Sequence, residues 1–512
     1  MLLKWFFRFS EIIRNQTLLK IIFGGFIFSL FLLNESGFLT FEFGFTIYPS
    51  YIMAFILLII LFYVKMKNKD FKFLGSGVDL PFLILVIVLL FSVIQSRFIL
   101  NNEFVPMSSS VSIFTRDIYF RSVTQVFSIV FMMVIFYLVF NIVREKKALI
   151  DALNILIISA TIACVFSLAA IYVCHFLKSN VFLNKYFSLL ILDEKVSGPR
   201  GLRLRGFSPE PLIFGTYLVS VLPVTLSACF SRYFKKALII PSLIIQSLTL
   251  FLTFSRSGWL ALFFALFTFL LLNLNNIFSF IRKNKLAILI LAITAIILAA
   301  AFNMFTGGRL VCKVQKSKLF EKINYSTFGQ IAILRNIKRY SEASKSDTPE
   351  LIIDNYNWGT MMRINDIVAG LNMFKEHPFL GVGWGNYIYQ YLRYDPQIIG
   401  WWWIKWPETG NRPGTPVCCN FPATIFAECG ILGILAFAFL AFRIIDIVFK
   451  GLAIALDRDL RIILAGLFSS LTAIFICYQF FSTFYYPFIW VVLGFTIATV
   501  RIITAERSNA QF

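Results

Sequence analysis

The sequence has few charged residues and very few histidines for its length. Of its 512 residues only 14% are charged and two are histidine, whereas 59% are hydrophobic and the mean hydropathy is +0.80. A soluble protein of this length does not carry so much apolar surface, so the composition predicts a polytopic helical membrane protein. The formal net charge is +21. Its basic residues fall in short clusters between apolar runs, which argues against nucleic acid as the partner.

Cysteine patterns of the disulfide and metal-binding kinds are missing as well. The eight cysteines lie mostly inside apolar runs and form no CxxC pair, so we expect no disulfide scaffold, no metal and no other cofactor. Cys312, Cys418 and Cys419 share one long loop, and the sequence does not decide whether two of them form a disulfide. The first twenty residues are basic and aromatic without a small-residue cleavage site, which predicts an interfacial helix rather than a removable signal peptide.

Long apolar runs dominate the chain. Twelve of them could cross a hydrocarbon core of about 30 Å, which predicts an all-α polytopic membrane protein with about 12 transmembrane helices. Basic clusters in alternate connections place those connections and both termini in the cytoplasm by the positive-inside rule. The runs lie near 18–33, 47–64, 80–96, 123–143, 148–177, 211–230, 237–254, 257–277, 286–303, 421–442, 462–480 and 485–503.

This topology leaves three longer connections on the outer side: 97–122, 178–210 and 303–420. The third predicts a loop domain at 303–420, between a membrane region at 1–302 (interfacial helix plus nine helices) and a second one at 421–512 (three helices). The loop contains three adjacent tryptophans, Trp401–Trp403, and Trp406. We interpret them as an interfacial anchor, with a sugar-stacking platform as the alternative.

Three arginines from distant parts of the chain are predicted on the outer face. Arg205 precedes the sixth run, Arg256 lies in the short turn between the seventh and eighth runs, and Arg363 opens an amphipathic segment of the loop domain. An interfacial arginine is the alternative interpretation for each of them. Because Arg256 interrupts a tight apolar hairpin, it needs a partner. Convergent guanidinium groups suit a phosphate or diphosphate, which their planar fork binds through two hydrogen bonds.

Four motifs occur in order around these arginines: RGFSPEPLIFGTYL, TFSRSGWLAL, HPFLGVGWGNY and NFPATIFAECGILGIL. Together they resemble the O-antigen ligase and O-antigen polymerase superfamily over about residues 200–440. The resemblance implies a C-type membrane glycosyltransferase fold in the bacterial inner membrane. It also implies a metal-independent, inverting transfer of a glycan from an undecaprenyl diphosphate carrier at the periplasmic face. The acceptor would be a hydroxyl of lipid A core, of another repeat unit or of a protein.

The resemblance also implies roles for individual residues. Arg256 and Arg363 match the paired arginines that bind the carrier diphosphate, and Arg205 and Glu210 are auxiliary substrate contacts. Breaking the bond from the anomeric carbon to the diphosphate develops negative charge that guanidinium groups stabilise.

The sequence departs from this pattern where the ligases carry a His-Asn pair that engages the acceptor, because Cys419-Asn420 stands there. The thiol is a poor base for a sugar hydroxyl. Asp366, His377 or Glu408 is an alternative base, or none is needed, or the acceptor has changed, or activity has been lost. For His377 the favoured interpretation is structural: a cationic imidazole that ends a helix before proline and suits the helix dipole.

The glycine turn Gly381–Gly385 has two interpretations. It can stop the helix and bend the backbone, or its N–H groups can contact the glycan or phosphate, with Gly383 and Asn386 at the site. A polysaccharide-related transporter or flippase and a non-catalytic family member are the rival classes. The sequence shows no repeated halves with paired broken helices, which favours the enzyme, and ligase against polymerase stays open.

Overall fold

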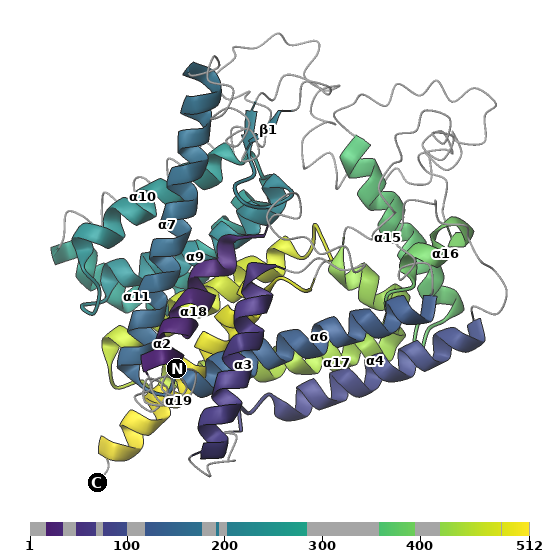
Figure 1. Cartoon of the computed structure of the whole chain (residues 1–512), viewed down its shortest axis with the longest axis horizontal. Helices are drawn as coiled ribbons and strands as arrows, with labels where there is room; N and C mark the ends of the chain where they lie inside the picture. Colours follow the sequence, from purple (N-terminus) through teal and green to yellow (C-terminus); the bar gives the residue numbers. More distant parts are fainter. Residues whose placement is uncertain are drawn as a thin grey trace, which may run out of the picture.

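The computed structural model describes residues 17–33, 48–67, 75–99, 118–176, 191–193, 202–283, 358–394, 420–482 and 484–510, and these are mostly helical (Figure 1). The helices are α2 (Thr17–Phe28), the 3-10 turn η1 (Ser29–Phe31), α3 (Pro49–Lys67), α4 (Asp79–Ile99), α6 (Ile118–Ile142), α7 (Lys146–Phe176), α9 (Pro211–Phe230), α10 (Lys236–Leu252), α11 (Arg256–Lys283), α15 (Trp358–Glu376), α16 (Tyr387–Tyr394), α17 (Phe421–Ile454), α18 (Arg458–Cys477) and α19 (Pro487–Ala510).

The predicted apolar runs coincide with helices wherever the structure describes them. Nine helices of the described residues are long and apolar enough to cross a membrane, and the shorter apolar helices Leu18–Phe31 and Lys236–Leu252 match two further runs. The run at 286–303 lies outside the described residues, and the loop domain at 303–420 is described only over 358–394. The polytopic all-α class is confirmed, and the count of twelve stays a prediction.

Helix α9 is the centre of the bundle. It starts with Pro211, whose fixed φ suits the first helical position, and nearly all its side chains are buried. Helices α7, α10, α11 and α18 pack around it. The contact with α18 is close: a Cβ added to Gly466 would lie 2.9 Å from the Pro223 carbonyl oxygen. Small residues at such positions let membrane helices approach.

The outer helices carry apolar stripes that face away from the protein. On α4 the exposed side chains include Leu83, Ile87, Phe91, Ile94 and Phe98, which recur every three or four residues along one face. A stripe at helical spacing that is apolar yet uncovered by protein suits contact with lipid.

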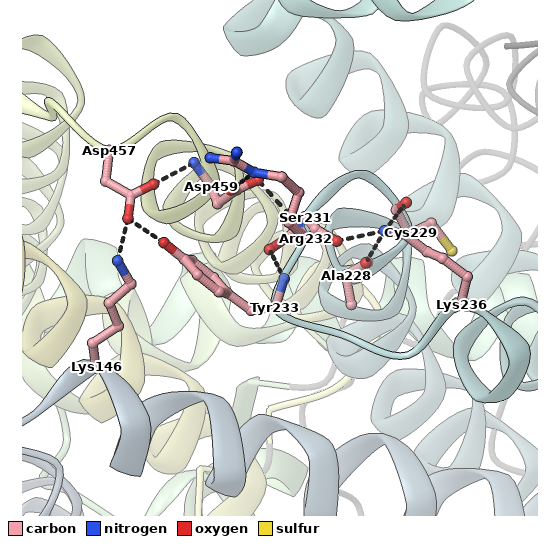
Figure 2. A network of polar contacts seen from close by, with 9 residues as sticks. All are labelled: Lys146, Ala228, Cys229, Ser231, Arg232, Tyr233, Lys236, Asp457 and Asp459. Atoms are coloured by element: carbon pink, nitrogen blue, oxygen red, sulfur yellow. Dashed lines mark hydrogen bonds and ion pairs between the residues drawn. The ribbon is translucent and has the colours of Figure 1, made fainter.

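The connections predicted as cytoplasmic meet at one end of the bundle. Asp457, before α18, accepts hydrogen bonds from Lys146 at the start of α7 and from Tyr233 between α9 and α10 (Figure 2). Arg232 donates to Asp459 over 2.8 Å, and Lys236 donates to carbonyls at the end of α9. Three connections far apart in sequence thus share one face, as the charge pattern requires.

Two short strands precede α9 and depart from the purely helical prediction. β1 (Ile191–Asp193) and β2 (Leu202–Leu204) pair antiparallel, with Leu192 opposite Arg203. This hairpin leads the chain to the opposite end of the bundle from the Asp457 network, where α9 begins.

Candidate active site

Arg256 stands at the sharp turn between α10 and α11. It is the first residue of α11, and its side chain is exposed. The turn is built by its own polar groups, because the N–H of Ser255 donates to Thr253 Oγ1 over 3.2 Å and the N–H of Gly258 donates to Ser255 Oγ over 3.3 Å. The hydroxyl of Ser255 thus acts as an N-cap for α11. The start of α11 also adds the positive end of its dipole to the guanidinium charge.

Arg205 and Glu210 lie on the segment that enters α9. Arg205 is half-buried and donates to the Pro209 carbonyl over 3.5 Å, and burial lowers the pKa of its guanidinium below the ordinary value. Glu210 is the N-cap residue of α9, in an extended conformation, and its exposed carboxylate makes no capping hydrogen bond. Both residues thus lie close to the first turn of α9, Arg205 through its bond to the Pro209 carbonyl and Glu210 as the N-cap residue.

Arg363 and Asn420 meet at the segment that follows α18. The guanidinium of Arg363 lies 5.9 Å from the ring centre of Phe480. Asn420 caps α17 by accepting from the Ala423 N–H over 2.9 Å, and its amide donates to the Gln479 carbonyl over 3.1 Å. The amphipathic helix of the loop domain and the start of α17 therefore share neighbours.

The turn with Arg256 lies at the same end of the bundle as this segment. A Cβ added to Gly215, in the first turn or two of α9, would lie 3.2 Å from Ser255 Cβ. Helices α9 and α18 run antiparallel, since Gly466 packs against Pro223 and Arg232 bonds to Asp459, so the start of α9 lies beside the end of α18. The segments that carry Arg205 and Arg256 therefore lie at the start of α9, and Arg363 lies beside the segment that follows α18. That the three arginines share one site stays a prediction.

Asp366 accompanies Arg363 on α15. It follows three residues later, about 4.5 Å along the axis and on the same side of the helix. Its side chain is only 4% exposed, and its carbonyl accepts from the Tyr387 hydroxyl over 2.7 Å. Among the described candidates for a base, Asp366 is the one close to Arg363 along the chain.

His377 lies at the other end of α15 from Arg363. Fourteen residues separate them, which is about 21 Å of helix. Burial, and the charge of Arg393, lower the pKa of His377 against the opposing effect of Glu376. The imidazole is 3.4 Å from the Tyr394 hydroxyl. The prediction that His377 ends a helix is confirmed, and burial acts against the cationic imidazole that would suit the helix dipole.

The glycine turn fills a break in α17. Gly430 interrupts that helix with φ 60° and ψ −155°, a conformation that only glycine adopts readily. The break frees two carbonyls and two N–H groups, and segment 378–383 pairs with all four. The bonds run from Val382 N–H to Ala427 O (2.8 Å), Gly383 N–H to Glu428 O (3.1 Å), Ile431 N–H to Pro378 O (2.8 Å) and Leu432 N–H to Phe379 O (3.2 Å).

These contacts favour the structural interpretation of the turn. The Gly383 N–H already donates within the protein, so it is not available to a glycan or phosphate as the alternative required. Asn386 is buried, where it accepts from the Ser122 hydroxyl over 3.0 Å and donates to the Val382 carbonyl over 3.4 Å. Gly383 and Asn386 belong with His377 to the turn that follows α15, and Tyr387, next to Asn386, reaches back to the Asp366 carbonyl of that helix.

Two residues that the sequence reading missed occupy key positions. Glu428 is 5% exposed inside α17 and accepts from the Tyr387 N–H over 2.9 Å. It is the single acidic residue of 421–442. A carboxylate inside a membrane segment indicates a functional or structural site, and this signal could have identified Glu428 from the sequence. Arg203 bonds to carbonyls of the α10–α11 turn. Cys419 and Glu408, together with Cys312, Cys418 and the four loop tryptophans, lie outside the described residues.

Comparison with protein-family models places part of the chain in a known family. Residues 241–409 match the family model described as O-antigen ligase, about a third of the chain. The predicted resemblance is confirmed. The O-antigen ligase match includes Arg256 and Arg363, together with most of α10 and all of α11, α15 and α16, whereas Arg205, Glu210 and Asn420 lie outside it. No curated protein matches the sequence significantly. The family supports a ligase- or polymerase-type function in a membrane, with lipid-linked glycans as its class of substrate.

Proposed function

We propose that the protein is a membrane glycosyltransferase that moves a glycan from an undecaprenyl diphosphate carrier to an acceptor hydroxyl at the extracytoplasmic face. The observation that supports the proposal is that Arg205, Arg256 and Arg363 come from separate segments at the start of α9 or the end of α18, opposite the Asp457 network. Three cations from separate segments at one end of an apolar bundle suit a substrate with several negative charges.

The chemistry needs stabilisation of the leaving group above all. As the bond from the anomeric carbon to the diphosphate oxygen breaks, negative charge grows on the diphosphate and oxocarbenium character grows on the sugar. Arg256 and Arg363 stabilise that charge, Arg256 with help from the dipole of α11. The acceptor hydroxyl attacks from the opposite side of the sugar, which inverts the anomeric configuration, and its proton passes to a base.

Asp366 is the base that we favour. It lies one helical turn from Arg363, and a carboxylate accepts a hydroxyl proton better than the neutral thiol of a cysteine does. His377 stands about 21 Å further along α15, too far to act on a substrate held by Arg363. Glu408 and Cys419 remain alternatives by sequence alone.

The test replaces each arginine in a strain that lacks the chromosomal gene. We expect Arg256→Ala or Arg363→Ala to lower glycan transfer about 100- to 1,000-fold, the effect of removing one donor that stabilises transition-state charge. Arg458→Ala is the matched control, since Arg458 is exposed at the start of α18, at the opposite end of the bundle. Surface glycan is measured on gels and protein level by immunoblot. Normal glycan in both arginine variants would refute the proposal.

The same gels separate the two family activities. Long polymer that accumulates on the carrier without attachment indicates a ligase, and single capped repeats indicate a polymerase. Asp366→Asn should lower transfer without changing the amount of protein, because the amide keeps the size of the side chain and loses its basicity.

A further inference from the structure

The turn that presents Arg256 contains a backbone conformation that its sequence disfavours. Phe254 has φ 50°, and it is the one non-glycine residue with positive φ in the described part of the chain. Non-glycine residues pay a steric penalty there, so such a conformation persists only where surrounding groups hold it. Phe254 lies two residues before Arg256, between the end of α10 and the start of α11. Its φ therefore sets the direction in which α11 leaves the turn.

Arg203 is bonded to the peptide groups of this turn. Its Nε donates to the Thr253 carbonyl over 3.1 Å, and its terminal nitrogen reaches the Phe254 carbonyl at 3.5 Å. Arg203 itself is fixed by the pairing of β2 with β1, opposite Leu192. A guanidinium that spans two successive carbonyls restrains the orientation of both peptide planes.

The aromatic neighbours of Phe254 do not replace this restraint. The Phe254 ring lies 6.3 Å from the ring of Phe251 and 6.4 Å from that of Trp259, both in tilted contacts. These contacts stabilise the side chain, and a ring can keep them while the following peptide rotates. The bonds from Arg203 act on the carbonyls that φ and ψ orient, which is where the left-handed conformation is decided.

We propose that Arg203 is a positioning residue, which holds Phe254 in its left-handed conformation and so fixes the backbone from which Arg256 reaches the diphosphate. This inference rests on the proposed function, because it gives Arg203 a task only if Arg256 binds the carrier.

The test measures binding of undecaprenyl diphosphate to the full-length protein in detergent, with undecaprenol as the probe that lacks the diphosphate. We expect Arg203→Met to weaken diphosphate binding about tenfold, as the turn relaxes from its strained conformation. Arg203→Lys, which can reach one carbonyl, should give a smaller loss. Undecaprenol binding should stay unchanged in both. Arg458→Met, at the opposite end of the bundle, is the matched control and should bind as the unsubstituted protein does.

A second substitution distinguishes positioning from direct contact. Glycine adopts φ 50° without the steric penalty, so in a Phe254→Gly background the loss caused by Arg203→Met should shrink to about threefold or less. An equal loss in both backgrounds means that Arg203 touches the ligand itself and overturns the inference. Melting temperatures identify variants that fail to fold, and Arg203→Lys then carries the comparison.

The outcomes also separate this inference from the proposed function. If Arg256→Ala binds undecaprenyl diphosphate normally, the proposed function fails and the inference fails with it. If Arg256→Ala loses binding whereas Arg203→Met retains it, the inference alone is wrong.

Discussion

Gly430→Ala should disrupt the junction between the glycine turn and α17. The substitution adds one methyl group at a position with φ 60° and ψ −155°, where a non-glycine residue costs about 1–3 kcal/mol. The new Cβ would lie 2.5 Å from the Phe379 carbonyl carbon and 2.6 Å from the Pro378 oxygen. These are backbone atoms, which cannot rotate aside.

The size of the effect follows from what must move. If the turn withdraws, the two bonds from Ile431 and Leu432 to segment 378–379 lengthen first, each worth about 1 kcal/mol in net terms. With the backbone strain, the expected loss is about 3–5 kcal/mol of unfolding free energy. Non-helical backbone inside a membrane helix survives only where protein groups satisfy it, which gives the substitution little room for relaxation.

The assay is thermal unfolding of the purified protein in detergent, together with surface glycan from the complemented deletion strain. Gly75→Ala is the matched control, since its added Cβ would make only an ordinary 3.5 Å contact with Asp79 and the position is exposed. We expect the control to stay within about 0.5 kcal/mol. A Gly430→Ala protein that melts and works like the unsubstituted one would show that the turn does not complete α17.

Two further predictions concern carboxylates that accept hydrogen bonds within the protein. Glu428→Gln should retain stability because the amide oxygen can accept from the Tyr387 N–H, whereas Glu428→Leu removes that acceptor and should cost about 1–3 kcal/mol, measured by melting. The pKa of Asp457 is lowered, because hydrogen bonds from Lys146 and Tyr233 outweigh the raising effect of burial. Its contribution is therefore present above the ordinary value of 3.8 and is lost as the pH falls through the lower folded value. At neutral pH the Asp457→Asn variant should be less stable than the unsubstituted protein by about 1–2 kcal/mol. This difference in unfolding free energy should shrink below pH 3.8. An equal difference at both pH values would contradict the ion pair between Lys146 and Asp457.

Hydropathy, together with the residues that start and stop helices, predicted the membrane helices well. The run at 211–230 has the same bounds as α9, because Pro211 is a strong start signal and Arg232 and Lys235 follow the end. The grouping of basic connections at one end also followed from the sequence, since the positive-inside rule acts on each connection separately. The strand pair before α9 was missed because three-residue strands leave no detectable alternation.

The candidate site was predictable only in part. Arginine is costly near hydrocarbon, so Arg205 and Arg256 were recognisable one by one. Arg203, two residues before Arg205, was passed over because its partners are carbonyls of a turn about fifty residues later. The separation of His377 from Arg363 did follow from the sequence, because one amphipathic helix was predicted with Arg363 near its start and His377 at its end.

The broken helix lay beyond sequence reasoning for a different reason. Glycine clusters indicate left-handed backbone but do not say which segment pairs with it. The four bonds of the junction join residues 378–383 to residues 427–432, and backbone groups carry no side-chain signature of their partner. Only the lone Glu428 in an apolar run indicated that this part of α17 needed attention.

The junction also constrains how the protein is made. Segment 378–383 is synthesised about fifty residues before the part of α17 that it completes, so it has left the ribosome when Gly430 emerges. Helix α17 can then form its bonds with segment 378–383 as it folds, so the carbonyls of residues 427 and 428 are not left without donors in lipid. A truncated chain that ends before α17 would leave the turn at 378–383 without its backbone partners. A chain that begins after this turn would leave the backbone groups around Gly430 without partners from any other described segment.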